Sequence, residues 1–381
     1  MGKIYTALGL MSGTSMDGVD ASIVQSDGNS EYLTILDQYF AYGVELRNKL
    51  INLRDKIFEP DDFGKYQNEL NSIEREVTLF HSIVVKKILE DSKIKPELLG
   101  FHGQTIFHNS EKRITKQLGD GQLLSQLTKK IVLYDFRQND LINGGQGAPL
   151  TPIFHNLLSK IIKNNHQLEY PISFINIGGI SNITNIIKEE GEIEKKLEAF
   201  DIGPGNCLID KWIRKNTKKN FDENGSIAES GKINKLILNQ AIENFKISSY
   251  HKSMDVKDFD ISFIRGLSLE DGCATITSFT AYLIAEGILY LSNNNKKKFI
   301  YLICGGGRKN NYLISLIKNY ISIKNNIILE PIENYGLDGD YIESQAFGYL
   351  AIRSFLNLPI SFPTTTRCNS PTSGGKLVKN F

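Results

Sequence analysis

A layout of strands and glycine-bearing turns that occurs twice in this 381-residue chain constrains its fold more than any other feature. In each half, two strand-like runs flank a glycine turn, at 12–18 and at 177–181, and a third strand-like run follows. The expected strands are 5–11, 19–25 and 31–40 in the first half and 172–176, 182–187 and 197–201 in the second. The halves therefore share a layout, although their residues do not repeat letter by letter.

Helices and strands alternate after each group of three strands. The most regular pattern is an apolar stripe at spacings of three and four from Phe63 to Ile88, which predicts one long helix. Further strands are expected at 131–136 and 299–304, and a last helix at 341–355. This alternation predicts an α/β protein of two lobes, each a mixed sheet flanked by helices, with a cleft between the lobes.

The chain length suits two domains with full hydrophobic cores. We expect one lobe to contain 1–145 together with about 350–381, and the other to contain 146–349. The 44 basic and 43 acidic side chains leave a net charge of +1, which creates no field strong enough to gather nucleic acid or an anionic membrane. The expected partner is therefore a small molecule at a local site.

The four cysteines are far apart and form no C-x-x-C pair, so neither a zinc site nor a disulfide framework is expected. The first residues lack the pattern of a secretory signal. The most apolar stretch, 279–291, is interrupted by polar residues and is expected to be too short to span a bilayer. These features predict a cytoplasmic protein.

Glycine turns can bring backbone N–H groups together into concave sets of donors that suit phosphate oxygens. The chain has such clusters at 12–18, 177–181 and 305–307. Neither a P-loop nor a Rossmann glycine pattern occurs. Each cluster alone is explained as well by a tight turn, but three clusters at corresponding strand ends favour a site that clamps ATP. The remaining glycines are expected to serve turns only.

Several motifs in chain order resemble one kinase family. Met-Ser-Gly-Thr-Ser at 11–15 and Gly-Gly-Gln-Gly-Ala-Pro-Leu at 144–150 are the most specific of them. The others are His-Gly-Gln-Thr at 102–105, Asp-Phe-Arg at 135–137, Asn-Ile-Gly-Gly-Ile-Ser-Asn at 176–182, Phe-Asp-Ile-Gly-Pro-Gly-Asn at 200–206 and Cys-Gly-Gly-Gly at 304–307. Over nearly its whole length the chain resembles the anhydro-N-acetylmuramic acid kinases, sugar kinases of the acetate kinase, hexokinase and actin superfamily.

The resemblance implies two actin-like, ribonuclease-H-like lobes and an ATP-dependent reaction. In that reaction water adds at C1 of 1,6-anhydro-N-acetylmuramic acid, the anhydro ring opens, and O6 receives the γ-phosphoryl group. The product is N-acetylmuramic acid 6-phosphate, an intermediate of cell-wall recycling. ATP and Mg²⁺ are the expected cofactors, an amino sugar the expected substrate, and a homodimer the expected assembly.

The resemblance assigns the catalytic base to Asp201. A carboxylate suits this task because it is ionised at neutral pH and can accept a proton from water. From the residues alone, Asp201 is equally suited to capping the turn before Gly203. The family's sugar-contacting glutamate falls on Glu343, although a carboxylate in the first turn of a helix also simply favours the helix dipole.

Gln104, Arg137 and Asp140 lie in matching motifs and are secondary candidates for contacts to the sugar or its lactyl carboxylate. The guanidinium of Arg137 suits a carboxylate because it can donate two parallel hydrogen bonds, but it could equally pair with Asp135 or Asp140. His102 is expected to be a structural histidine rather than a catalyst.

The nucleotide is expected to contact the glycine clusters and their neighbours. The assigned residues are Ser12, Gly13, Thr14, Ser15, Met16, Asp17, Gly18, Val19, Gly178, Gly179, Gly203, Gly205, Asn206, Gly305, Gly306 and Gly307. The aspartate that orients the metal in hexokinase relatives is missing near Leu10, so Asp17, Asp20 or Asp201 acting through water are the open alternatives for Mg²⁺.

One loop and one single residue depart from the family's common pattern. The loop 252–257 reads Lys-Ser-Met-Asp-Val-Lys where Lys-Ser-Thr-Gly-Arg-Glu is common, and Arg367 stands where glycine is common. Two other functions stay open at this point: a kinase of the same fold that phosphorylates another sugar directly, and an actin-like module that works by nucleotide-dependent assembly.

Overall fold

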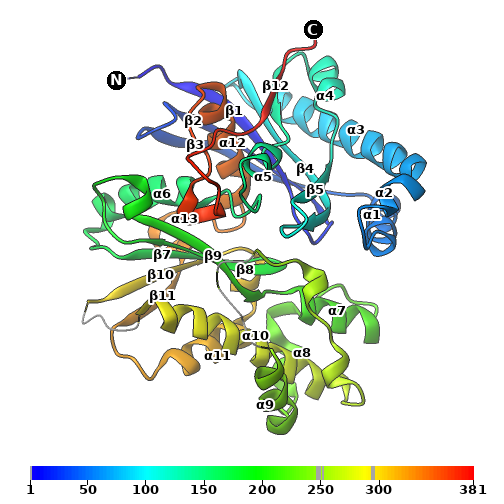
Figure 1. Cartoon of the computed structure of the whole chain (residues 1–381), viewed down its shortest axis with the longest axis vertical. Coiled ribbons are helices and arrows are strands. Elements are labelled where there is room, and N and C mark those ends of the chain that lie inside the picture. The colour runs from blue at the N-terminus through cyan, green and yellow to red at the C-terminus, as the bar shows by residue number, and fades with distance from the viewer. Residues whose placement is uncertain (1, 246–249, 251–252, 293–296) are drawn as a thin grey trace. The chain divides into compact units, whose positions relative to one another are not determined.

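The structure, a computed structural model, describes residues 2–245, 250, 253–292 and 297–381. The chain divides into two compact units (Figure 1). Unit 1 comprises Met1–Leu158 and Asp340–Phe381, and unit 2 comprises Ser159–Gly339. The chain passes from unit 1 to unit 2 inside a continuous helix, α6 (Pro152–His166). The sequence prediction placed the boundaries at 145 and about 350 instead. A boundary within a helix carries no glycine or proline punctuation that a sequence pattern could reveal.

Each unit contains one sheet. The strands are β1 (Tyr5–Ser12), β2 (Gly18–Ser26), β3 (Tyr32–Ala41), β4 (Leu98–Asn109), β5 (Ile114–Leu118), β6 (Ile131–Tyr134), β7 (Ile172–Ile177), β8 (Ile180–Ile186), β9 (Leu197–Pro204), β10 (Phe299–Cys304), β11 (Ile327–Pro331) and β12 (Lys376–Val378). The other helices are α1 (Val44–Lys56), α2 (Asp62–Lys65), α3 (Gln67–Asp91), α4 (Gly121–Thr128), α5 (Gln138–Ile142), α7 (Cys207–Asn216), α8 (Ser226–Ser230), α9 (Lys235–Asn244), α10 (Leu269–Ser292), α11 (Asn311–Ile321), α12 (Ile342–Phe355) and α13 (Pro363–Thr366).

The two sheets share one strand order. Unit 1 follows β12-β6-β4-β1-β2-β3, with β5 paired to β4, and unit 2 follows β11-β10-β7-β8-β9. In both, the first three strands pair antiparallel. A further strand, β4 or β10, pairs in parallel with the other edge of the first strand, and β6 or β11 pairs in parallel with that strand. This order, third-second-first-fourth-fifth, is that of the ribonuclease-H-like fold. The prediction of two α/β lobes, each with a mixed sheet, is confirmed.

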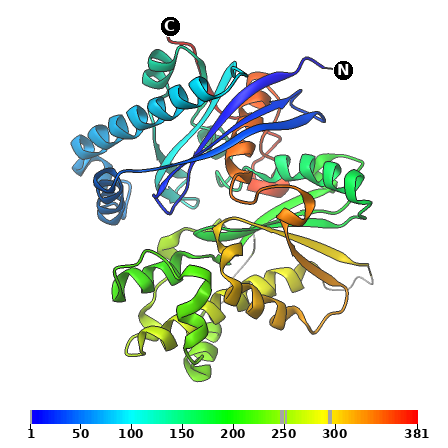
Figure 2. The same ribbon diagram turned by 180° about the vertical axis from the view of Figure 1, so that it is seen from behind.

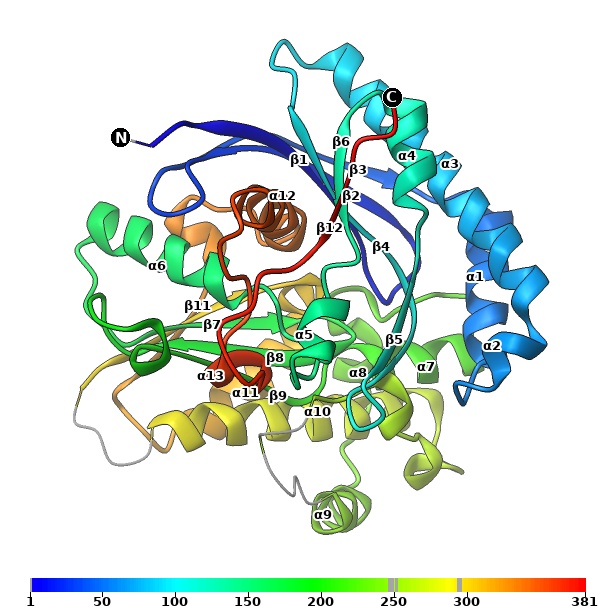
Figure 3. The same cartoon turned by 45° about the horizontal axis from the view of Figure 1, so that its top comes forward.

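In unit 1 the helix α12 packs on one face of the sheet, against β1, β2 and β4, and α3 lies on the other face (Figures 2 and 3). The approach of α12 depends on glycines inside strands. A Cβ atom on Gly9 would lie 1.9 Å from the carbonyl oxygen of Ser344, and one on Gly100 would lie 2.2 Å from that of Phe347. The expectation that glycines outside the three clusters serve turns only is wrong, because Gly9 and Gly100 make room for a helix.

In unit 2 the 24-residue helix α10 packs against β9 and against α7, α8, α9 and α11. The apolar stretch 279–291 is part of this longer helix, which is long and apolar enough to cross a bilayer by length and composition alone. However, 72% of its apolar window is buried inside the protein. The apolar composition of α10 is therefore explained by its place in the core of unit 2.

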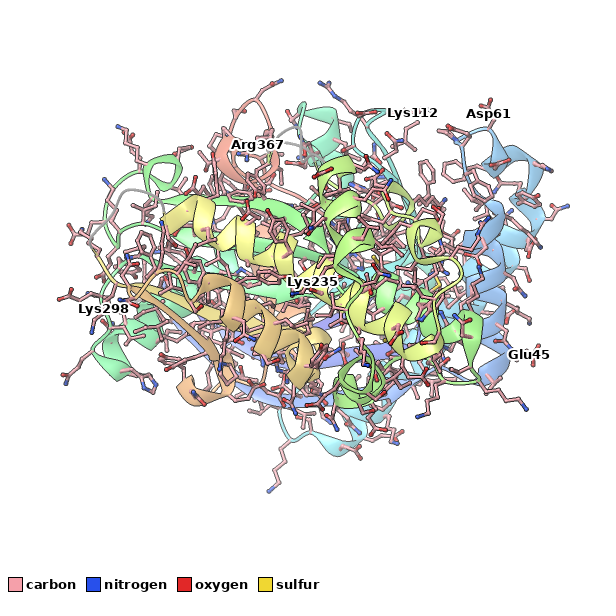
Figure 4. All side chains as sticks on the ribbon, turned by 90° about the horizontal axis from the view of Figure 1, so that it is seen from below. Glu45, Asp61, Lys112, Lys235, Lys298 and Arg367 are labelled. Atoms are coloured by element: carbon pink, nitrogen blue, oxygen red, sulfur yellow. The ribbon has the colours of Figure 1, made fainter. Side chains whose placement is uncertain are left out.

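The structure also corrects the long helix expected from Phe63 to Ile88. Phe63 belongs to α2 and Tyr66 lies between the helices, so the helix α3 starts only at Gln67. Charged side chains such as Glu45, Asp61 and Lys112 project from this part of the surface (Figure 4).

Candidate active site

The turn between β1 and β2 in unit 1 presents a short exposed rim. Thr14 and Ser15 are exposed, whereas Ser12 and Met16 on either side of them are buried. Met16 closes the turn: its N–H donates to the carbonyl oxygen of Gly13 (3.2 Å), its φ is +54°, and its side chain is 1% exposed. The hydroxyl of Ser15 donates to the carboxylate of Asp17 (2.6 Å). Residues 13–15 are thus held where they can meet a ligand, and the apolar Met16 side chain anchors them.

Ser12 has a different place from the phosphate contact that the sequence suggested. Its hydroxyl is fully buried, 3.1 Å from Nε2 of His81 and 2.9 Å from the hydroxyl of Tyr42. Burial lowers the pKa of His81 to about 4, so the ring is neutral, and its Nδ1–H donates to the carbonyl oxygen of Val77. Nε2 is then an acceptor, which means that Ser12 donates to His81 and accepts from Tyr42. These buried hydrogen bonds between Tyr42, Ser12 and His81 stabilise the turn.

Gln104 reaches the same turn from the neighbouring strand. β4 pairs in parallel with β1, and a register irregularity brings Gln104 opposite Ser12. Its amide Nε2 donates to the carbonyl oxygen of Gly13 (2.8 Å), while its buried Oε1 has no hydrogen-bond partner within the described residues. Gln104 therefore fixes the turn, and its unpartnered oxygen is available to a donor from a ligand or a water molecule.

Arg137 is oriented by His102. Its Nη2 lies 2.9 Å from Nε2 of His102, and its Nη1 donates to the carbonyl oxygen of Gly147 (2.8 Å). Burial, together with the neighbouring guanidinium, holds the pKa of His102 well below its ordinary value, so the ring is neutral. Its Nδ1–H donates to the carbonyl oxygen of Gly103 (2.7 Å), which leaves Nε2 to accept from Arg137. His102 has the structural place expected for it.

Asp140 ties three segments of unit 1 together. Its side chain is 1% exposed and accepts from the N–H of Gly147 (2.7 Å) and from the hydroxyl of Thr366 (2.5 Å). Gly145 lies against this carboxylate, since a Cβ there would be 2.1 Å from Oδ2. These bonds give Asp140 a structural role. Asp135, the other carboxylate suggested as a partner of Arg137, forms an ion pair with Lys376 (2.6 Å).

Glu343 stands in the first turn of α12 and is partly exposed. Arg367, labelled in Figure 4, caps the C-terminal end of α13 with φ of +67°. That left-handed conformation favours glycine, which explains why glycine is common at this position in the family that the sequence resembles. The guanidinium of Arg367 donates to the carbonyl oxygen of Thr364 (2.9 Å).

In unit 2 the glycine turn between β7 and β8 docks on the start of α7. The carbonyl oxygens of Gly178 and Gly179 accept from the N–H groups of Asn206 (2.8 Å) and Gly205 (2.9 Å). The side chain of Asn206, the N-cap residue of α7, makes no capping hydrogen bond, and the N–H of Cys207 donates to the carbonyl oxygen of Gly179 (3.3 Å). A helix N-terminus suits a phosphate group in general, because backbone N–H groups and the helix dipole both favour negative charge. Gly203, with φ of +147°, passes close to Leu283 of α10.

The glycine triplet follows β10, next to the end of β7. Gly305 has φ of +78°, and a Cβ atom on it would lie 2.3 Å from the Asn176 side chain. A Cβ atom on Gly307 would lie 2.2 Å from Ile177, so both glycines are required by packing. Gly306 differs, because its Cβ would meet only the amide nitrogen of Asn206, at 3.9 Å. The open space over Gly306 fits the flat ligand surface that the sequence suggested.

Asp201 lies on β9, with its side chain 5% exposed. Its Oδ2 accepts from the hydroxyl of Ser253 (3.2 Å) and from the N–H of Met254 (2.8 Å). The sequence assigns neither residue to the site, because the loop 252–257 departs from the family's common pattern. Lys252 itself lies outside the described residues. The sequence also assigns no role to His81 or Tyr42, although His81 is a polar residue within the apolar stripe of α3.

No group of three or more His, Cys, Asp or Glu side chains that could hold a metal ion gathers within the described part of the chain. Of the three aspartates considered for Mg²⁺, Asp17 and Asp20 belong to unit 1 and Asp201 belongs to unit 2.

Comparison with known proteins agrees with the motifs. The family model described as "Anhydro-N-acetylmuramic acid kinase" matches residues 5–380. A relative of that name from Pelagibacter ubique (strain HTCC1062) is 52% identical over the full length of both chains, and one from Agrobacterium fabrum is 38% identical, also over the full length of both. Component A of the (R)-2-hydroxyglutaryl-CoA dehydratase of Acidaminococcus fermentans is a similar solved structure, with 15% identity, a TM-score of 0.44, and coverage of 92% of this chain and 98% of its own.

The family model thus spans nearly the whole chain, and relatives of equal length share from a third to a half of its residues. The chain belongs to the anhydro-N-acetylmuramic acid kinase family.

Proposed function

We propose that this protein converts 1,6-anhydro-N-acetylmuramic acid, water and ATP into N-acetylmuramic acid 6-phosphate and ADP. A water oxygen forms a bond to C1, and the bond between C1 and O6 breaks. O6 then bonds to the γ-phosphorus of ATP while the bond from that phosphorus to the leaving ADP oxygen breaks. Asp201 takes a proton from the attacking water. The product serves cell-wall recycling.

The observation that carries this proposal is the carboxylate of Asp201, 5% exposed and held by two hydrogen-bond donors on one oxygen. Two donors on one oxygen hold the carboxylate in a fixed orientation. An ionised and oriented carboxylate is what a general base needs at neutral pH. These bonds run to residues 52 and 53 positions further along the chain, so they join β9 to the segment that starts at Ser253.

Each unit contributes a set of groups suited to ATP. In unit 2 these are the glycine turn at Gly178 and Gly179, the N-terminus of α7 and the open face of Gly306. In unit 1 the exposed rim formed by Gly13, Thr14 and Ser15 offers backbone and hydroxyl donors. That both sets act on one nucleotide stays a prediction from the family resemblance. When bound, Mg²⁺ neutralises charge on the phosphate oxygens during transfer.

Sugar recognition is proposed for Glu343 and Arg137. His102 and the carbonyl oxygen of Gly147 orient the guanidinium of Arg137, which suits the lactyl carboxylate of the sugar. Asp140 and Gln104 act through the backbone segments that they hold. A homodimer remains a prediction, which size-exclusion chromatography with light scattering tests.

The decisive experiment is incubation with ATP and anhydro-N-acetylmuramic acid, with ADP release measured and the product weighed by mass spectrometry. The expected product is heavier than the sugar by one phosphoryl group and one water. A product heavier by phosphate alone would identify a kinase that phosphorylates a hydroxyl directly. Nucleotide-dependent assembly without sugar-dependent ADP release would instead identify an actin-like module.

A further inference from the structure

The strand β9 directs Asp201 away from the main apolar core of unit 2. Phe200 and Ile202, its neighbours on either side, belong to the apolar cluster that α10 covers. Successive side chains of a strand point to opposite faces of the sheet. Asp201 therefore lies on the other face, where its side chain is still only 5% exposed. A carboxylate with so little exposure has to be satisfied by protein donors.

The segment that starts at Ser253 supplies two such donors. The Ser253 hydroxyl at 3.2 Å and the Met254 N–H at 2.8 Å both reach Oδ2 of Asp201. Ser253 is itself buried, with 6% of its surface exposed. The contact therefore belongs to the interior of unit 2 and is not a chance meeting of surface groups.

The chain that follows is locally braced. Asp255 and Asp258 form a reciprocal capping box: the N–H of Asp255 donates to Oδ2 of Asp258 (2.8 Å), and Oδ1 of Asp255 accepts from the N–H of Lys257 (3.0 Å). Such a box fixes the direction in which the chain enters a helical turn. It thereby fixes where the N–H of Met254 points.

We propose that Ser253 and the backbone N–H of Met254 are the positioning residues of Asp201, which hold its carboxylate in the orientation needed to take a proton from water. This inference rests on the proposed function, in which Asp201 is the base. It also explains how the divergent loop is tolerated. The contribution of residue 254 is a backbone N–H, which any residue except proline supplies, whereas Ser253 contributes its side-chain hydroxyl.

The test compares the full-length protein with Ser253→Ala, Ser253→Thr and the control Ser315→Ala. Ser315 is an exposed serine of the same unit, and its hydroxyl donates only to the carbonyl oxygen of Tyr312 (2.7 Å). We expect Ser253→Ala to lower kcat by about 10-fold, with the KM for the sugar and the Kd for ATP changed by less than about 2-fold, because one hydrogen bond to a charged group is lost. Ser253→Thr retains a hydroxyl and should remain within about 3-fold of the wild-type kcat.

A second measurement does not depend on turnover. The N–H of Met254 is protected from hydrogen exchange by its bond to Asp201, so Asp201→Ala should increase the exchange rate of the 253–258 segment by about 10-fold or more. Unchanged exchange in Asp201→Ala would overturn the inference. So would a wild-type kcat in Ser253→Ala, or a loss that appears equally in KM and in ATP affinity. If wild-type protein releases no ADP in response to the sugar, the proposed function fails, whatever the exchange data show.

Discussion

Replacing Gly9 by alanine is expected to be among the most destabilising single changes in unit 1. Gly9 lies in β1 beneath α12, and a Cβ atom there would be 1.9 Å from the carbonyl oxygen of Ser344 and 2.4 Å from the backbone nitrogen of Gly348. Both atoms are backbone, so neither can rotate away. Glu343, the proposed sugar contact, precedes Ser344 in the same helix.

The magnitude follows from these distances. An ordinary contact needs about 3.4 Å, so α12 would have to move by about 1.5 Å from its seat on the sheet. Overpacking typically costs about 1–3 kcal/mol, and a rigid backbone obstacle puts this case at the upper end or above it, near 3 kcal/mol. Because domains are stable by only about 5–15 kcal/mol, such a loss is readily measured.

Urea unfolding followed by circular dichroism measures the effect, with two alanine variants as comparisons. Gly64 lies in α2 with nothing within 4 Å of the added atom, so Gly64→Ala should be neutral or stabilising by up to about 1 kcal/mol. Gly348→Ala would meet a methyl group of the buried Val24 at 2.7 Å and the backbone nitrogen of Gly9 only at 3.3 Å, so it should cost less than Gly9→Ala. If the free energy of unfolding of Gly9→Ala lies within about 0.5 kcal/mol of the wild-type value, the close packing of α12 on β1 is refuted.

Three further outcomes are expected. Asp201→Asn should keep the wild-type affinity for ATP, measured by calorimetry, and lose about 10²–10⁴-fold in kcat, whereas a near-normal rate would contradict its assignment as the base. Ser12→Ala leaves the buried Tyr42 hydroxyl and His81 Nε2 without their partner, so it should cost about 1–3 kcal/mol in urea unfolding; an unchanged midpoint would argue against these buried hydrogen bonds. Burial lowers the pKa of His81 to about 4, against 6.5 in an unfolded chain. The unfolded chain therefore binds a proton more readily than the folded protein, and the free energy of unfolding falls below pH 6.5. The fall amounts to about 3 kcal/mol by pH 4. His81→Gln should therefore show a smaller difference in unfolding free energy between pH 7 and pH 4.5 than the wild type, and equal differences would refute this origin.

Much of the local structure followed from sequence patterns because periodicity and turn residues are local properties. The runs around β1, β2 and β3 and around β7, β8 and β9 predicted two similar sheets, and the strand β10 has the predicted bounds. The motif from Met11 to Ser15 identified the turn that forms the exposed rim. The amphipathic stripe of α3 was visible for the same reason, since its apolar residues recur with the helical period.

The sequence alone could not assign roles within the candidate site, because those roles depend on contacts between distant residues. The sequence suggested Ser12 as a donor to phosphate, but its hydroxyl is hydrogen-bonded to Tyr42 and His81. Asp140 looked like a sugar contact, but Gly147 and Thr366 take its carboxylate.

By itself, the sequence determined the fold class, the family and the segments that carry the chemistry, since all three are written in local motifs and their order. Tertiary structure decided which face each side chain occupies and which groups it meets. It paired β4 with β1 so that Gln104 holds Gly13, and it brought Ser253 to Asp201 across 52 positions of chain. It also required Gly9 and Gly100 for the seat of α12. These outcomes depend on non-local packing and on satisfying buried polar groups, which no short window of residues records.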